Sequence, residues 1–91
     1  MQPDMRRKTR ARLARVEGQV RGVARMIQDD RYCVDVMIQI AAVRAALKKI
    51  EEAVLRDHLD SCVFNAMEVA DATERQQKIA ELVDLFGRLG L

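Results

Sequence analysis

Three side chains in this 91-residue sequence are of the types that bind soft metal ions: Cys33, His58 and Cys62. They are the only cysteines and the only histidine that the sequence contains. His58 and Cys62 are four positions apart, which on a helix puts both on one face and close enough to bind the same ion. Cys33 precedes His58 by 25 positions, or roughly 37 Å of helix at about 1.5 Å per residue. One unbroken helix therefore cannot bring all three together, and a shared site requires two subunits.

The segment that carries these residues is predicted to be one long helix, from residue 31 or 32 to a point in 66–70. Between Cys33 and Cys62 it contains no Gly and no Pro. Its apolar residues recur at alternating steps of four and three, which is helical periodicity. These apolar residues are Val36, Ile40, Val43, Leu47, Ile50 and Val54.

Two further helices are expected on either side of the long one. The first covers about 4–29, with Gly18 and Gly22 as sites of close helix–helix approach. The other is short, covers about 74–86, follows a loop over 69–73, is capped by Thr73 and ends at Gly87. The seam of the first helix consists of Leu13, Val16, Val20, Val23 and Ile27.

The expected fold class is therefore all-α, with a long, long, short three-helix subunit in a single domain over 1–91. Three helices of this size cannot bury all of these apolar stripes in a monomer, so we expect at least a dimer whose long helices pack antiparallel. Antiparallel packing places Cys33 of one subunit beside His58 and Cys62 of the other. Two thiolates and one imidazole favour Cu(I), because structural zinc sites normally have four ligands. The competing interpretation is that both cysteines are buried and only pack.

Charge is distributed unevenly along the chain. Residues 1–25 hold eight basic and two acidic side chains, whereas the rest of the chain holds eight basic and twelve acidic ones. This basic arm indicates a polyanionic partner. No apolar run is long enough to cross a membrane and no signal peptide is recognisable, so we expect a cytoplasmic protein without a membrane partner. A phosphate-binding loop and a nucleophile–base pair are both missing, so no enzymatic activity is expected.

Five strings in the sequence resemble the CsoR/RcnR family of bacterial metal-sensing repressors. The resemblance covers about residues 6–86 and implies an all-α subunit, an antiparallel four-helix-bundle dimer and a dimer-of-dimers tetramer. It also implies that the apo form binds double-stranded operator DNA and releases it when the effector binds. The strings are Arg15-Val-Glu-Gly-Gln-Val-Arg-Gly22, Arg25-Met-Ile, Tyr32-Cys-Val-Asp-Val-Met37, Gln39-Ile-Ala-Ala-Val43 and His58-Leu-Asp-Ser-Cys62.

Within this family the ligand set resembles that of the copper sensors. The resemblance implies Cu(I) bound by Cys33 of one subunit with His58 and Cys62 of the other. Tyr32 and Glu81 match positions that, in the copper sensors, lie next to the metal ligands without binding the metal. For DNA binding, Arg12 and Lys49 match basic positions of the family, and Arg15 and Arg21 are the further candidates on the basic arm.

The function expected from the sequence is a Cu(I)-responsive transcriptional repressor. Two alternatives stay open at this point. One is a repressor of the same family that responds to persulfide or thiol oxidation by linking Cys33 to Cys62 of the partner. The other is a helical oligomerisation module with an inert thiol pair and no DNA partner.

Overall fold

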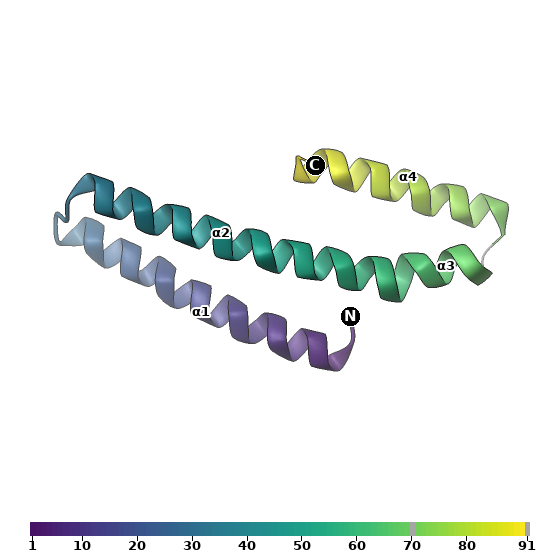
Figure 1. The fold of residues 1–91 in the computed structure, drawn as a ribbon, viewed down its shortest axis with the longest axis horizontal. Coiled ribbons are helices and arrows are strands. Elements are labelled where there is room, and N and C mark those ends of the chain that lie inside the picture. The colour runs from purple at the N-terminus through teal and green to yellow at the C-terminus, as the bar shows by residue number, and fades with distance from the viewer. Residues whose placement is uncertain (70, 91) are drawn as a thin grey trace. The chain divides into compact units, whose positions relative to one another are not determined.

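The computed structural model describes residues 1–69 and 71–90, with the side chains of residues 62, 63, 66 and 69 left out. Within this part of the chain all regular structure is helical. The elements are α1 (Pro3–Gln28), α2 (Cys33–His58), the π-helical segment η1 (Leu59–Val63), α3 (Phe64–Val69) and α4 (Ala72–Leu89). The predicted all-α class is confirmed, with α2, η1 and α3 together forming the long second helix (Figure 1).

The chain reverses direction between α1 and α2 in a turn closed by backbone hydrogen bonds. The Arg31 N–H donates to the Met26 carbonyl at 2.9 Å, and the Asp30 N–H donates to the Ile27 carbonyl at 3.2 Å. These two bonds, with Asp30 in the left-handed region at φ 53°, form a Schellman motif. The predicted first helix, about 4–29, therefore ends where expected, and only residues 29–32 separate it from α2.

The second helical run has the predicted extent but contains a turn that the sequence did not predict. After His58 the backbone becomes π-helical, and the Phe64 N–H donates to the carbonyl of Leu59, five residues earlier. Such wider turns occur mostly as single insertions within α-helices, frequently at functional sites. The run then continues as α3 to Val69.

Helix α4 is longer than predicted at both ends. Its N-cap is Asp71, whose carboxylate accepts a hydrogen bond from the Glu74 N–H at 2.9 Å, so the prediction of Thr73 as the cap is wrong. Gly87 lies inside the helix, and Gly90, at φ 73°, is the C-cap, so the predicted stop at Gly87 is also wrong. Of the loop expected over 69–73, Ala70 lies outside the described residues.

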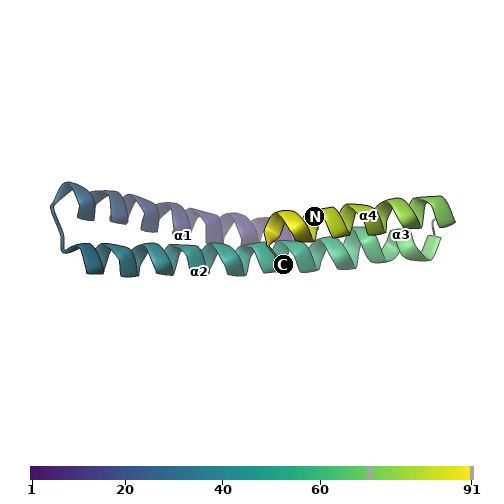
Figure 2. The same ribbon diagram turned by 90° about the horizontal axis from the view of Figure 1, so that it is seen from above.

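The chain divides into two compact units, Met1–Arg56 and Asp57–Leu91. In the first unit, α1 and the part of α2 up to Arg56 run antiparallel and side by side (Figures 1 and 2). The few side chains that this pair buries include Val16 and Ile50, which are 6% and 8% exposed, together with Val36 and Thr9. In the second unit, α3 continues directly from η1 and contacts α4.

An exposed apolar face lies on one side of the α1–α2 pair. Each residue advances about 100° around a helix, so Val20 lies about 40° to one side of the buried Val16. Val20 is 51% exposed and Ile27 is 60% exposed. The apolar face, as we use the term below, consists of Leu13, Val20 and Ile27 of α1 with Ile40 and Leu47 of α2, all exposed.

The two glycines of α1 do not bring α1 close to α2. A Cβ atom added at Gly22 would meet no atom within 4 Å, and one added at Gly18 would meet only the Arg21 guanidinium, at 3.9 Å. Within the described protomer these glycines therefore do not mediate close helix–helix approach, and approach by a helix of another subunit stays a prediction.

Candidate functional site

The three predicted metal ligands lie at the ends of α2 and in η1. Cys33 is the first residue of α2, and its free thiol is exposed. His58 is the last residue of the same unbroken helix and is half-buried. Cys62 belongs to η1, but its side chain lies outside the described part of the structure. Among the described residues, no three His, Cys, Asp or Glu side chains of one chain converge as a metal site.

The π-helical turn changes the geometry assumed for His58 and Cys62. The prediction placed them on one face of an α-helix, whose hydrogen bonds join residues four apart. In η1 the bond instead spans five residues, from Phe64 back to Leu59. The two ligands therefore lie on a wider turn than predicted, and their joint coordination of an ion stays a prediction.

The donor set itself is suited to a soft, low-coordinate metal ion. Two thiolates and one imidazole match the preferences of Cu(I), and an exposed thiol such as that of Cys33 can reach an ion shared with another subunit.

Tyr32 and Glu81, which are predicted to lie next to the metal ligands, belong to different units of the chain. Tyr32 directly precedes α2 and is 69% exposed. Glu81 lies on α4, where its carboxylate is 3.5 Å from the ammonium group of Lys78. Their roles beside the metal ligands stay predictions.

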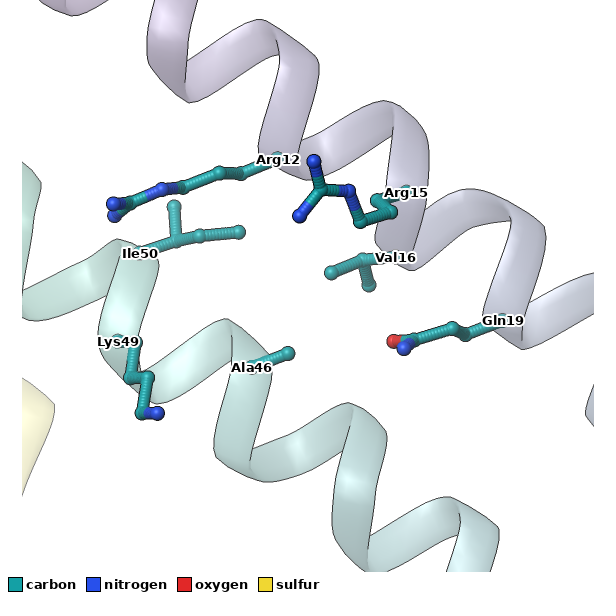
Figure 3. Close-up of a pocket in the computed structure, with 7 residues that line it drawn as sticks. All are labelled: Arg12, Arg15, Val16, Gln19, Ala46, Lys49 and Ile50. Atoms are coloured by element: carbon teal, nitrogen blue, oxygen red, sulfur yellow. The ribbon is translucent and has the colours of Figure 1, made fainter.

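Three of the four predicted DNA-binding side chains line one groove between α1 and α2. The groove has a volume of about 330 Å³. Arg12 extends from α1 over Ile50 of α2, the Arg15 guanidinium stays beside α1, and Lys49 lies on α2 and points away from α1 (Figure 3). We call this feature the cationic groove; its lining consists of Arg12, Arg15, Val16, Gln19, Ala46, Lys49 and Ile50.

The fourth candidate, Arg21, does not line this groove. Its guanidinium donates a hydrogen bond to the Glu17 carboxylate at 3.0 Å, and both side chains are exposed. In the described part of the chain, Arg12, Arg15 and Lys49 have no carboxylate within ion-pair distance. These three cations are therefore free to neutralise a ligand's charge, whereas Arg21 must first leave Glu17.

Sequence reasoning missed the uncharged residues of the groove. Val16 and Ile50 were assigned to the core seams, and Gln19 and Ala46 received no functional role. The signal that could have found them is the pairing of α1 with α2 across the short turn, since this pairing places Val16 and Ile50 in the lining of one groove (Figure 3). A second concave surface, of about 460 Å³, lies on α1 alone and is lined by Pro3, Arg6, Arg7, Arg10 and Ala11.

Comparisons with known proteins connect these features to a family. The sequence profile described as "Metal-sensitive transcriptional repressor" matches residues 5–88. The chain is 48% identical over 75 residues to the copper-sensing transcriptional repressor CsoR of Bacillus subtilis (strain 168), a match that covers 82% of this chain and 71% of that protein. The chain spans 58% to 71% of the length of the first curated relatives that it matches.

Two solved structures have the same fold. The crystal structure of the copper-sensing repressor CsoR with Cu(I) from Geobacillus thermodenitrificans NG80-2 matches with a TM-score of 0.89 and 34% identity, covering 100% of this chain and 92% of that one. The nickel-responsive transcriptional regulator InrS matches with a TM-score of 0.77 and 39% identity, covering 90% of this chain and 89% of that one. In the described residues, no helix combines the length and hydropathy that crossing a membrane requires. With the profile matching nearly its whole length, this chain belongs to the metal-sensitive transcriptional repressor family, the CsoR/RcnR family expected from its motifs.

Proposed function

We propose that this chain is a Cu(I)-responsive transcriptional repressor, acting in the cytoplasm, whose apo form binds operator DNA and whose Cu(I)-bound form releases it. The fold alone does not select the metal, because one structural neighbour is named for copper and another for nickel. The observation that carries the proposal is the donor set of two cysteines and one histidine. Soft thiolates in a low-coordinate site favour Cu(I) over nickel, which prefers nitrogen and oxygen ligands.

The proposed site is shared between two subunits. Cys33 of one subunit, with His58 and Cys62 of a partner subunit, would hold the ion. Exposure of the Cys33 thiol supports this arrangement, because a ligand that serves a neighbouring subunit must be accessible on its own protomer. Tyr32 and Glu81 would lie outside these ligands and orient them by hydrogen bonding, as outer groups do in metal sites generally.

The apolar face supports the assembly that such a site requires. Its five residues form a stripe on both long helices, and burying them against a second copy would remove them from water. We propose an antiparallel four-helix-bundle dimer on this face, and two such dimers in the tetramer. The cationic groove lies on the opposite side of the α1–α2 pair, because Arg12 lies about 40° to the other side of Val16 from Val20. A dimer on the apolar face therefore leaves the groove open.

The proposed operator surface is the cationic groove together with the basic arm of α1. Arg12, Arg15 and Lys49 supply unpaired positive charge, and a tetramer would present four copies of this set to the phosphates. Arg21 would contribute less, because Glu17 already neutralises it.

The test is an anaerobic titration of the apo protein and labelled operator DNA with Cu(I), followed by fluorescence anisotropy. Coupling between effector and DNA sites is typically about 1–3 kcal/mol, so we expect affinity to fall about 5- to 150-fold. Cys33→Ala should keep the apo affinity and lose the response to Cu(I). An operator affinity unchanged at saturating Cu(I) would contradict the proposal, and loss of apo binding in Cys33→Ala would make Cys33 structural.

A second candidate function is favoured by one observation, the exposed free thiol of Cys33. Exposed thiols are open to persulfides and oxidants, so the repressor could respond to reactive sulfur by linking Cys33 to Cys62 of a partner. Mass spectrometry after polysulfide treatment separates the two functions. A copper-only sensor releases DNA without any inter-subunit cross-link, whereas a thiol switch forms the cross-link in proportion to the DNA released.

A further inference from the structure

The cationic groove contains more than the positive charge that a phosphate needs. Its base is formed by Val16 and Ile50, which are 6% and 8% exposed. Ala46 lines the groove from α2 with a single methyl group, and the Gln19 amide lies at one end (Figure 3). A surface that only attracted phosphates would need neither a concave shape nor an apolar base, since counterion release depends on charge alone.

The size of the groove is that of a small ligand and not of a single ion. At about 330 Å³ it falls at the lower end of the roughly 300–1,000 Å³ that ligand pockets occupy. The volume corresponds to about ten water molecules at roughly 30 Å³ each. A phosphate group with one attached sugar is of this order, whereas a whole base-paired step is not.

The residues that line the groove suit both the phosphate and the sugar of a sugar–phosphate unit. The planar guanidinium groups of Arg12 and Arg15 bind phosphate oxygens through paired hydrogen bonds. The carbon atoms of a deoxyribose ring can lie on the half-buried Ala46, above the nearly buried Val16 and Ile50, so that most of the apolar surface removed from water is that of the sugar and of Ala46. The deoxyribose ring carries no charge. The groove can therefore hold the anionic phosphate beside the arginines and the sugar carbons on its apolar base.

We propose that the cationic groove is a one-nucleotide subsite, which binds a backbone phosphate of DNA together with its attached deoxyribose. This inference rests on the proposed function, because it takes operator DNA as the partner. It adds that each protomer holds one sugar–phosphate unit in a fixed position. Contacts to phosphate and sugar position a protein on the duplex without reading the bases, so the subsite fixes register and leaves sequence recognition to other contacts.

The first experiment fills the base of the groove without changing its charge. Ala46→Leu should lower operator affinity about tenfold and reduce the slope of log K against log salt by about 0.9 for each phosphate displaced. Ala14→Leu, the same substitution at an exposed position of α1 outside the groove, should leave both unchanged. Circular dichroism of the two variants checks that each remains helical.

The outcomes separate this inference from the proposed function. If Arg12→Gln weakens DNA binding but Ala46→Leu does not, the subsite is wrong and operator binding through charge stands. If the wild-type chain binds no DNA, the proposed function fails, and the second experiment decides whether the groove is still a sugar–phosphate site.

The second experiment uses small probes with the full-length apo protein. Amide chemical shifts are followed during titration with 2-deoxyribose 5-phosphate or inorganic phosphate at constant ionic strength. The sugar phosphate should bind at least about fourfold more tightly, the factor expected for each CH₂ removed from water, and should shift the amides of Val16, Ala46 and Ile50. Equal affinity for the two probes, or the same shifts in Ala46→Leu, would overturn the subsite.

Discussion

Gly22→Ala should stabilise the protein, although glycine at this position is part of a family-like motif. Gly22 lies well inside α1, and an added Cβ would meet no atom within 4 Å. No steric cost therefore opposes the gain in helix propensity, which is about 0.8–1.0 kcal/mol for Ala over Gly in a helix interior. For a domain of about 60–100 residues, each 1 kcal/mol raises the melting temperature by roughly 4–8 °C.

The assay is thermal unfolding followed by circular dichroism at 222 nm, with operator affinity measured on the same samples. Gly90→Ala is the matched control, because its Cβ would also meet nothing, but its φ of 73° lies in the left-handed region. There the Cβ costs about 1–2 kcal/mol, so Gly90→Ala should not raise the melting temperature. A lower melting temperature for Gly22→Ala would refute the reasoning, because another molecule would then have to occupy the space beside Gly22.

Three further predictions test the helix ends and the groove. Asp71→Ala should destabilise α4 by about 1 kcal/mol, because the Glu74 N–H loses its acceptor; unchanged hydrogen-exchange protection over residues 72–76 would count against the cap. Gly87→Ala should raise the melting temperature through about 1 kcal/mol of helix propensity, since α4 continues past it; a decrease would restore Gly87 as the helix end. Arg12→Gln should reduce the salt slope of operator binding by about 0.9, and Arg21→Gln by less, because Glu17 already pairs with Arg21; equal reductions would contradict the assignment of the groove.

The long helices could be predicted from the sequence because their apolar residues recur over many turns. The start of α1 and the extent of the run from α2 to α3 follow this pattern closely. The π-helical turn could not be predicted, because one residue inserted over Leu59–Val63 changes the spacing too little to be seen in so short a stretch.

The predicted ends of α4 were wrong because, at each end, two residues close together in the sequence can both terminate a helix. Asp71 and Thr73 both cap helices well, and Glu74 settles the choice, because it lies three positions after Asp71 as in a capping box. Gly87 and Gly90 can both end a helix, and only the backbone angle at Gly90 distinguishes them.

The candidate site was predictable in its residue types and less so in its geometry. Arg12, Arg15 and Lys49 were named from charge and resemblance, but their grouping needs the pairing of α1 with α2. The Glu17–Arg21 pair follows an ordinary spacing of four residues and could have been found. The metal ligands stay a prediction, because Cys33 and His58 lie at opposite ends of α2 and the side chain of Cys62 lies outside the described part of the structure.

The expected class of function agrees with the family. Membership of a family described as metal-sensitive transcriptional repressors agrees with the expectation of a regulatory role. It also disfavours the alternative of an oligomerisation module without a DNA partner.

The small number of buried side chains ties the amount of protein to its stability. The apolar residues buried in the described part of the chain are Val16, Val36 and Ile50, and none of them is completely removed from solvent. If the proposed dimer forms, a domain of this size with so little core would gain much of its folding free energy on assembly, so its melting temperature should rise with protein concentration. A cell that makes few copies would then hold a larger fraction unfolded. The abundance of such a repressor would set how much of it is folded, as well as how many operators it can occupy.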